Sequence, residues 1–166
     1  MCIRDSTRGG AIQLSTTYSN IIEDCDFTNN STTDFGGAIY NISGQLTITN
    51  CDFVLNFTSA TEAGGAIFGT NSAGIQMTNS FFYDNASGAG GAVNWRGDAG
   101  GSFLNIIDNC DFTTNNALIN GASSREGGGA LYFEKDVSIS NSKFVGNSVP
   151  TNAWGGAIQL LSLIHI

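Results

Sequence analysis

Residues 36–56 read GGAIYNISGQLTITNCDFVLN, and the short motifs at the two ends of this stretch recur along the chain. The first motif is Gly-Gly-Ala followed by an aliphatic residue, and it begins at residues 9, 36, 64, 90, 128 and 155. The second is Phe-x-x-Asn, and its copies stand at residues 27–30, 53–56, 82–85, 112–115 and 144–147. Intervals of 27, 28, 26, 38 and 27 residues between the glycine motifs predict a solenoid, whose repeats bury their apolar faces against one another.

Each repeat has the alternation of short β-strands and no helical period. In the quoted repeat we expect strands over 36–40 and 46–53, with a bend in the second. Ile48 and Phe53 have opposite parity, so both face inward only if the chain turns a corner at Asn50. Asn and Asp tolerate the left-handed backbone that such a corner often requires. Every repeat has one of them at this position: Asp24, Asn50, Asn79, Asn109 and Asn141.

Superposing the repeats predicts columns of like side chains on coils about 4.8 Å apart, as a parallel β-helix requires. The aromatic column contains Phe27, Phe53, Phe82, Phe112 and Phe144. The amide column contains Asn30, Asn56, Asn85, Asn115 and Asn147. An aliphatic column contains Ile22, Ile48, Met77, Ile107 and Ile139. A column of small residues contains Cys25, Cys51, Ser80, Cys110 and Ser142.

The glycine pairs, such as Gly36 and Gly37 or Gly64 and Gly65, have two interpretations. Paired glycines allow a tight corner and a close approach of neighbouring coils. Glycine-rich turns also bind phosphate. The motif lacks the lysine and the following helix of a phosphate loop, so the sequence favours the structural role.

Composition excludes several classes of protein. The 166 residues carry 6 Lys+Arg against 14 Asp+Glu, a net charge of −8, with no basic run. This balance argues against nucleic acid and against an anionic membrane surface as partners. No stretch approaches the roughly 18 apolar residues that a membrane-spanning helix needs. We therefore expect a β-helix that does not itself span a membrane.

The two ends of the chain look foreign to the repeat array. Residues 1–6 (MCIRDS) and 161–166 (LSLIHI) can be back-translated into nearly reverse-complementary DNA strings that resemble a sequencing adapter. We expect both to be artefacts and residues 7–160 to be the β-helix, cut from a longer array and truncated at both ends. His165, the only histidine, would then play no part in catalysis or metal binding. Open coil edges would favour aggregation of the isolated fragment.

Carboxylates are the main candidates for enzymatic chemistry. Paired carboxylates suit glycoside hydrolysis, and clustered Asp with a basic residue suits calcium-assisted lyase chemistry. The candidates are Asp24, Asp26, Asp52, Asp108 and Asp111. Phe81 and Lys143 interrupt the outward column of Asp26, Asp52 and Asp111, which favours a solvated acidic edge and leaves calcium at Asp26 and Asp52 as a hypothesis. The other basic residues near the loops do not occupy equivalent positions in the repeats: Arg96, Arg125 and Lys135.

Cysteines and exposed aromatic residues supply two further hypotheses. Cys25 and Cys51 lie on successive coils, close enough for a disulfide, but serine at the same place in other repeats favours buried thiols. Aromatic side chains in a common surface could stack on glycans or contact a partner, although packing within loops is the simpler alternative. The aromatic residues expected to be exposed are Tyr40, Trp95, Tyr132 and Trp154.

Together, the motifs resemble the repeats of the polymorphic outer membrane proteins of chlamydiae and related bacteria. They read GGAI, GGAI, GGAI, GGAV, GGAL and GGAI, alternating with FTNN, FVLN, FYDN, FTTN and FVGN, over nearly all of residues 9–158. The resemblance implies an all-β fold, a right-handed parallel β-helix of about five coils and of the pectin lyase-like kind. It also implies the passenger of an autotransporter-like surface protein, with adhesion as the usual role.

The expected function is that of a non-enzymatic extracellular module that presents loops for contact with host cells, matrix or glycans. We expect no catalytic residue, cofactor or metal in the chain. Neighbouring coils of a longer chain are further expected partners, and the location is the cell surface, associated with the outer membrane if the resemblance holds. Two alternatives stay open. One is a fragment of a polysaccharide lyase or glycoside hydrolase, and the other is a structural spacer of a large surface protein.

Overall fold

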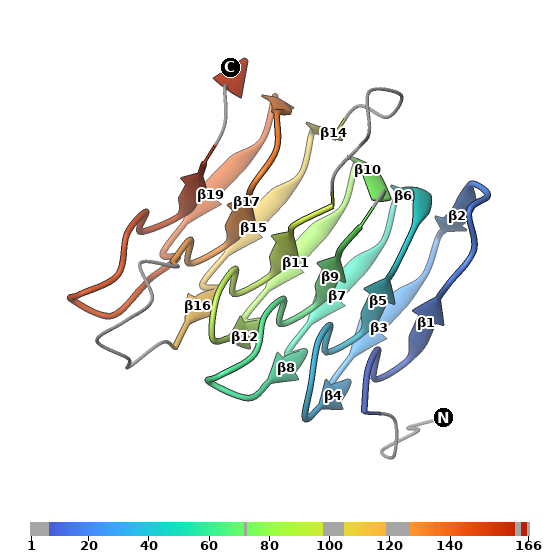
Figure 1. Ribbon diagram of the computed structural model, residues 1–166. Coiled ribbons are helices and arrows are strands. Elements are labelled where there is room, and N and C mark those ends of the chain that lie inside the picture. Colours follow the sequence, from blue (N-terminus) through green and yellow to red (C-terminus); the bar gives the residue numbers. More distant parts are fainter. Residues whose placement is uncertain (1–6, 72, 98–104, 119–126, 162–163, 166) are drawn as a thin grey trace.

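The computed structural model describes residues 7–71, 73–97, 105–118, 127–161 and 164–165. In this part of the chain all regular structure is β, and every strand pairing is parallel. The chain passes through four sheets in turn and then returns to the first, one coil further along (Figure 1). About five such coils form the solenoid, which confirms the predicted parallel β-helix.

Each sheet takes one strand from each successive coil, and we name the sheets A to D in the order in which the chain enters them. Sheet A contains β1 (Ile12–Leu14), β5 (Ile39–Asn41), β9 (Ile67–Gly69), β13 (Val93–Trp95), β17 (Leu131–Phe133) and β20 (Ile158–Leu160). Sheet B contains β2 (Asn20–Glu23), β6 (Gly44–Thr49), β10 (Ala73–Thr78), β14 (Asn105–Asp108), β18 (Val137–Ser140) and β21 (Ile164–His165).

The other two sheets are built from shorter strands. Sheet C contains β3 (Asp26–Thr28), β7 (Asp52–Val54), β11 (Phe81–Tyr83), β15 (Asp111–Thr113) and β19 (Lys143–Val145). Sheet D contains β4 (Ser31–Thr32), β8 (Phe57–Thr58), β12 (Ala86–Ser87) and β16 (Asn116–Ala117). Because neighbouring strands of a sheet come from adjacent coils, the backbone hydrogen bonds of the strands join one coil to the next.

The core lies inside the coils and runs along the stack. Alternate residues of each strand point inward, so Ile48 and Met77 are fully buried and stand opposite each other in β6 and β10. The register then continues through the aliphatic column: Ile22, Ile48, Met77, Ile107 and Ile139. Each of these side chains therefore packs on its counterpart one coil away, which is how a narrow coil obtains a continuous apolar core.

The corners differ in part from the sequence-based expectation. The strand expected over 36–40 begins only at Ile39, because Gly36 has a φ of 67° and forms a corner with Gly37. The corner expected at Asn50 is present, with a φ of 54°, and it places β6 and β7 in different sheets. The bend expected within 46–53 is thus a change of sheet.

Candidate functional site

The aromatic column forms a continuous stack inside the solenoid. The rings of Phe53 and Phe82 lie with centroids 4.8 Å apart and planes 3° from parallel. The centroid distances of the remaining pairs are 4.8 Å for Phe27 and Phe53, 4.6 Å for Phe82 and Phe112, and 4.9 Å for Phe112 and Phe144. The structure therefore brings the five predicted phenylalanines together in the interior, where they contribute to packing.

The amide column forms a hydrogen-bond ladder beside the stacked rings. Asn85 Oδ1 accepts from the backbone N–H of Asn56 at 3.0 Å and from its Nδ2 at 2.9 Å. Asn85 Nδ2 in turn donates to the carbonyl oxygen of Phe53 and to Asn115 Oδ1, both at 2.9 Å. The same pattern joins Asn30 to Asn56 and Asn115 to Asn147. These amides satisfy the polar groups of a buried corner, so they are unavailable to a ligand.

The glycine corners are closed by contact between coils. A Cβ added at Gly37 would lie 2.0 Å from the carbonyl oxygen of Gly65, so only glycine fits there. The N–H groups of Gly36 and Gly37 donate to Ala63 and Gly64 of the next coil. The same crowding holds at Gly65, where an added Cβ would meet a backbone oxygen of the following coil at 2.0 Å. A phosphate loop needs free N–H groups at such a turn, and here they are bonded.

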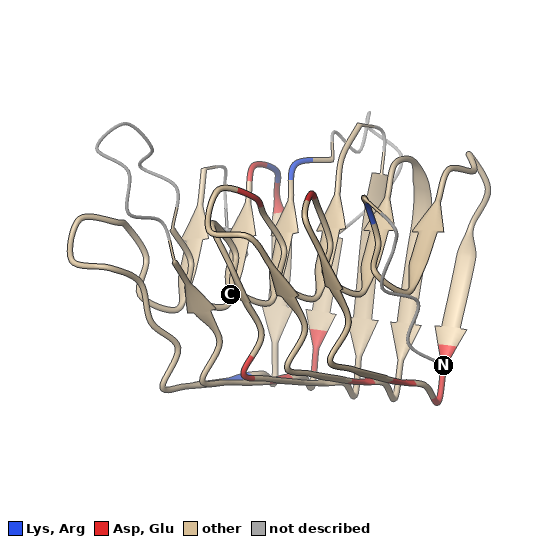
Figure 2. Ribbon diagram, turned by 90° about the horizontal axis from the view of Figure 1, so that it is seen from below, with Lys and Arg blue, Asp and Glu red and all other residues tan. Residues whose placement is uncertain are grey.

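The outward carboxylates of sheet C are placed in one column but not in one cluster. Asp26 and Asp52 are register partners in β3 and β7, and Phe81 separates Asp52 from Asp111. Lys143 Nζ lies 3.3 Å from Asp111 Oδ2 in an ion pair open to solvent. Acidic segments recur along the lower side of the solenoid in Figure 2.

Two other candidate carboxylates lie at the ends of the sheet B strands. Asn50 Nδ2 donates to Asp24 Oδ1 at 2.5 Å. Asp108 Oδ1 accepts from Ser140 Oγ at 2.7 Å and from Asn141 Nδ2 at 2.8 Å, and these bonds lower the pKa of Asp108. A lowered pKa suits an acceptor rather than a proton donor. Within the described residues no three His, Cys, Asp or Glu side chains are arranged to hold a metal ion.

The expectation that four aromatic residues are exposed was wrong for three of them. Trp95 is fully buried, because it has the inward parity of Val93, and its Nε1 donates to the carbonyl oxygen of Ala73 at 3.1 Å. Tyr40 and Tyr132 are also buried. Tyr40 lies in a small cluster outside the main core, in which residues from the D-to-A connections pack against sheet A: Phe35, Tyr40, Ala63, Phe68 and Ala89. Trp154 alone of the four is exposed.

Arg96, which shares no repeat position with the other basic residues, packs over two aromatic side chains of sheet A. Its guanidinium carbon lies 5.8 Å from the ring centroid of Phe68 and 5.6 Å from that of Tyr132. Its Nε donates to Asn94 Oδ1 at 3.1 Å. Arg125, another of the predicted basic residues, lies outside the described residues. The arrangement explains the burial of Tyr132, whose ring is covered by the arginine.

The three cysteines in the described part of the chain, Cys25, Cys51 and Cys110, are free thiols. Cys51 and Cys110 are buried, and burial raises the pKa of both, that of Cys110 to about 11. A thiol with a raised pKa is a poor nucleophile and acts here as a small filler of the corner. Cys25, which is half-buried, lies at the same corner one coil before Cys51.

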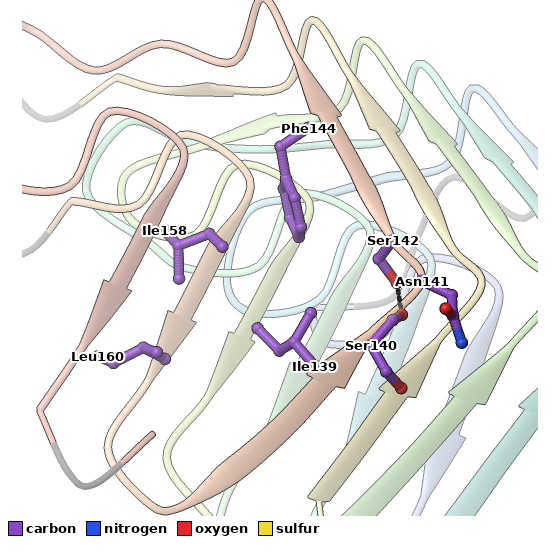
Figure 3. Close-up of a pocket in the computed structure, with 7 residues that line it drawn as sticks. All are labelled: Ile139, Ser140, Asn141, Ser142, Phe144, Ile158 and Leu160. Atoms are coloured by element: carbon purple, nitrogen blue, oxygen red, sulfur yellow. Dashed lines mark hydrogen bonds between the residues drawn. The ribbon is translucent and has the colours of Figure 1, made fainter. Parts of the chain in front are cut away.

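A hollow of about 660 Å³ lies at the C-terminal end of the described stack. Its apolar lining continues the interior columns, with Ile139 and Phe144 from coil five and Ile158 and Leu160 from β20 (Figure 3). The polar side of the hollow is the corner at residues 140–142, where Ser142 Oγ donates to the carbonyl oxygen of Ser140. The hollow is thus the exposed cross-section of the core, without polar groups converging on a bound molecule.

Residues 24–42 match the Chlamydia polymorphic membrane protein (Chlamydia_PMP) repeat. The match spans one Phe-x-x-Asn motif and one glycine motif, and it confirms the resemblance on which the sequence-based expectation rests. No curated protein and no solved structure matches the chain. A β-solenoid with this repeat fits a surface module of the autotransporter type. The described residues include no helix that is long and apolar enough to cross a membrane.

Proposed function

We propose that this chain is part of a non-enzymatic surface module whose β-helix presents loops for adhesion to cells, matrix or glycans. The observation that carries the proposal is that the repeat-defining side chains act inside the stack. The side chain of Asn85, for example, bonds to the coils on both sides of it. The repeat match at residues 24–42 supports the same assignment and a location at the cell surface.

Differences in length between the coils lie in the connections from sheet D to sheet A and from sheet A to sheet B, and the latter covers residues 15–19 after β1 but only 42–43 after β5. The connection from D to A covers residues 59–66 after β8 but only 88–92 after β12. Loops tolerate changes in length and sequence at little cost, and they often carry binding residues on a rigid scaffold. A stack with fixed coils and unequal connections suits a protein that contacts its partners through its loops.

A carbohydrate-active enzyme is the competing function. Its strongest support is the contact of Lys143 with Asp111, because a basic residue beside carboxylates suits lyase chemistry. Asp111 is, however, separated from Asp52 by Phe81, and the lysine meets a single carboxylate of the column. We therefore favour adhesion over catalysis.

Adhesion can be tested with the purified chain immobilised on a plate. We expect dose-dependent retention of cultured epithelial cells, or binding of fibronectin, laminin or collagen, above the level of heat-denatured chain and of albumin. Variants Tyr18→Ser and Trp154→Ser, both in exposed connections, test which loops take part. Retention no greater than on albumin would contradict the adhesive role.

The same preparation tests the enzymatic alternative. Polygalacturonate, alginate and cellulose oligomers are incubated with the chain, and new reducing ends and unsaturated uronates are measured. We expect no product. Product that disappears in Asp111→Asn would establish an active site at sheet C and overturn the non-enzymatic assignment.

A further inference from the structure

The third coil breaks the repeat on the outer face of sheet C. The position that Asp holds in β3, β7 and β15 is Phe81 in β11, and the position of Thr28 and Thr113 is Tyr83. Both side chains point outward, because Phe82 between them belongs to the internal stack. Tyr83 is 40% exposed and Phe81 is half-buried. Packing of the interior therefore does not account for these two rings.

The two rings lie side by side within a larger apolar area. Their centroids are 5.9 Å apart and their planes are 14° from parallel. Val54 is the register partner of Tyr83, and Leu55, at the adjoining corner, is 43% exposed. We call this area, with its neighbouring carboxylates, the sheet C patch: Asp52, Val54, Leu55, Phe81, Tyr83 and Asp111. Exposed apolar side chains gathered in this way mark a contact site.

Carboxylates border the rings on both sides. Asp52 and Asp111 are the register partners of Phe81, so each stands one strand spacing, about 4.8 Å, from it along the stack. Lys143 is the one basic residue in the five strands of sheet C, and it bonds to Asp111. Aromatic rings beside carboxylates favour a cation, because the ring faces attract positive charge and the carboxylates accept its N–H groups.

The molecule itself shows which cation fits such a site. On sheet A the guanidinium of Arg96 lies over Phe68 and Tyr132, and its Nε is 3.7 Å from Glu134 Oε1. Here an arginine, aromatic rings and a carboxylate come together. A planar guanidinium can stack on a ring and bond to a carboxylate at its edge, which an ammonium group does less well.

A second arginine repeats the arrangement. Arg8 lies over the ring of Tyr40, with its guanidinium carbon 5.5 Å from the centroid, and its Nε bonds to Asp34 Oδ2 at 2.6 Å. These are the two arginines that the structure describes. The sheet C patch has the rings and the carboxylates of this arrangement, but its own strands supply no arginine.

We propose that the sheet C patch binds an arginine-bearing segment of a partner protein. The guanidinium stacks on Phe81 and Tyr83 and donates N–H groups to Asp52 or Asp111. The net charge of −8 favours the approach of such a basic segment. Neutral glycans also stack on aromatic rings, but the bordering carboxylates favour a cation over a sugar. The proposal goes beyond adhesion through loops, because it assigns a partner chemistry to a sheet face.

The probe is a fluorescein-labelled octapeptide of alternating glycine and arginine, titrated with the full chain and followed by fluorescence anisotropy. The decisive variant is Phe81→Asp, which installs the residue that three of the four other coils have and adds a negative charge. We expect it to weaken binding about tenfold, because the stacking surface is lost. Attraction by charge alone predicts the opposite, tighter binding, and that result would overturn the proposal.

Three further variants keep the test valid even if Phe81→Asp does not fold. Tyr83→Thr, which copies Thr28 and Thr113, should also weaken binding, and Tyr18→Thr, at an exposed tyrosine outside the patch, should not change it. Lys143→Ala should tighten binding about threefold by releasing Asp111. Circular dichroism and the melting temperature verify the fold of each variant.

Two further ligands decide between arginine and other partners. The glycine–lysine octapeptide should bind more weakly than the arginine peptide, and equal binding would contradict recognition of the guanidinium. Cellohexaose, followed by calorimetry, should not bind, and binding that is lost in Phe81→Asp would identify a glycan surface instead. Cell retention is measured separately, so peptide binding and adhesion can fail independently.

Discussion

Two kinds of corner behave differently in this solenoid. The corner between sheets B and C takes two residues in each described coil: 24–25, 50–51, 79–80, 109–110 and 141–142. The connection from D to A, in contrast, covers residues 59–66 in one coil and 88–92 in another. The fixed corners contain the side chains that bond from coil to coil, whereas the variable connections have no such column. Repeated side-chain chemistry thus fixes the length of a corner, and its absence allows the length to change.

At two places a fixed corner keeps a left-handed backbone although the residue there disfavours it. Between sheets C and D, Leu55 has a φ of 57° and Thr114 a φ of 55°, although both residues disfavour this region. Asn56 and Asn115 follow them directly and are tied into the amide ladder. The ladder therefore outweighs the local preference of the backbone.

The largest expected effect comes from changing the length of each kind of corner. One glycine inserted between Asn79 and Ser80 moves the following strand out of register with its neighbours, and we expect the free energy of unfolding to fall by at least about 4 kcal/mol. The same insertion between Ala60 and Thr61, both in a variable connection, should cost less than about 1 kcal/mol. Urea denaturation of both variants measures the difference, and equal losses would remove the distinction between the corners.

A pair of glycine substitutions tests the close approach of the coils. At Gly65 an added Cβ would lie 2.0 Å from the carbonyl oxygen of Gly91, so Gly65→Ala should lower the free energy of unfolding by about 3 kcal/mol. A Cβ added at Gly156 would meet no heavy atom within 4 Å beyond its chain neighbours, and Gly156→Ala should change the free energy of unfolding by less than about 0.5 kcal/mol. Similar values for the two variants would show that the coils do not meet at Gly65.

The amide ladder should be strongest in its middle. Asn85→Ala leaves the N–H and the Nδ2 of Asn56 without their acceptor, and we expect a loss of about 2–3 kcal/mol in chemical denaturation. Asn30→Ala, at the first rung, removes a half-buried amide and should cost about 1 kcal/mol. If both changes cost the same, the amides act as separate surface groups rather than as a ladder.

The smallest expected effect is a gain in stability. Leu55→Asn installs the residue that coil one has at the same corner, Asn29, and Asn accepts a positive φ more readily than Leu. We expect the free energy of unfolding to rise by about 1 kcal/mol. Val54→Asn, one residue earlier in a strand, is the control and should not stabilise the chain. A destabilised Leu55→Asn would mean that the exposed leucine packs in a way that outweighs its backbone strain.

Much of the fold could be predicted because the same pattern of inward-facing residues occurs in five repeats. The Phe-x-x-Asn motif identifies the aromatic and amide columns. The odd spacing between the inward-facing Ile48 and Phe53 identifies the corner at Asn50. The second corner was missed at Leu55 and Thr114, which do not signal a left-handed backbone, although Asn29, Asp84 and Gly146 at the same place in the other coils do. Tertiary stacking sets that conformation.

The outer surface was predicted less well, for reasons visible in single residues. Trp95 could have been placed inside from its parity with Val93. Tyr40 has outward parity, and its burial depends on Phe35 and Phe68 outside the main core, which no local pattern reveals. Phe81 was visible as an interruption of the Asp column, but its pairing with Tyr83 needed the strand geometry.

The stacking of like side chains is tested most directly by contacts between the five phenylalanine rings. Nuclear Overhauser spectra are recorded on otherwise deuterated chain with protonated phenylalanine rings. Cross-peaks should connect Phe53 with Phe82 and join each other ring to its neighbour in the order 27, 53, 82, 112 and 144, with none between alternate coils. Absence of these cross-peaks in the folded chain, or contacts that skip a coil, would contradict the register from which every assignment here follows.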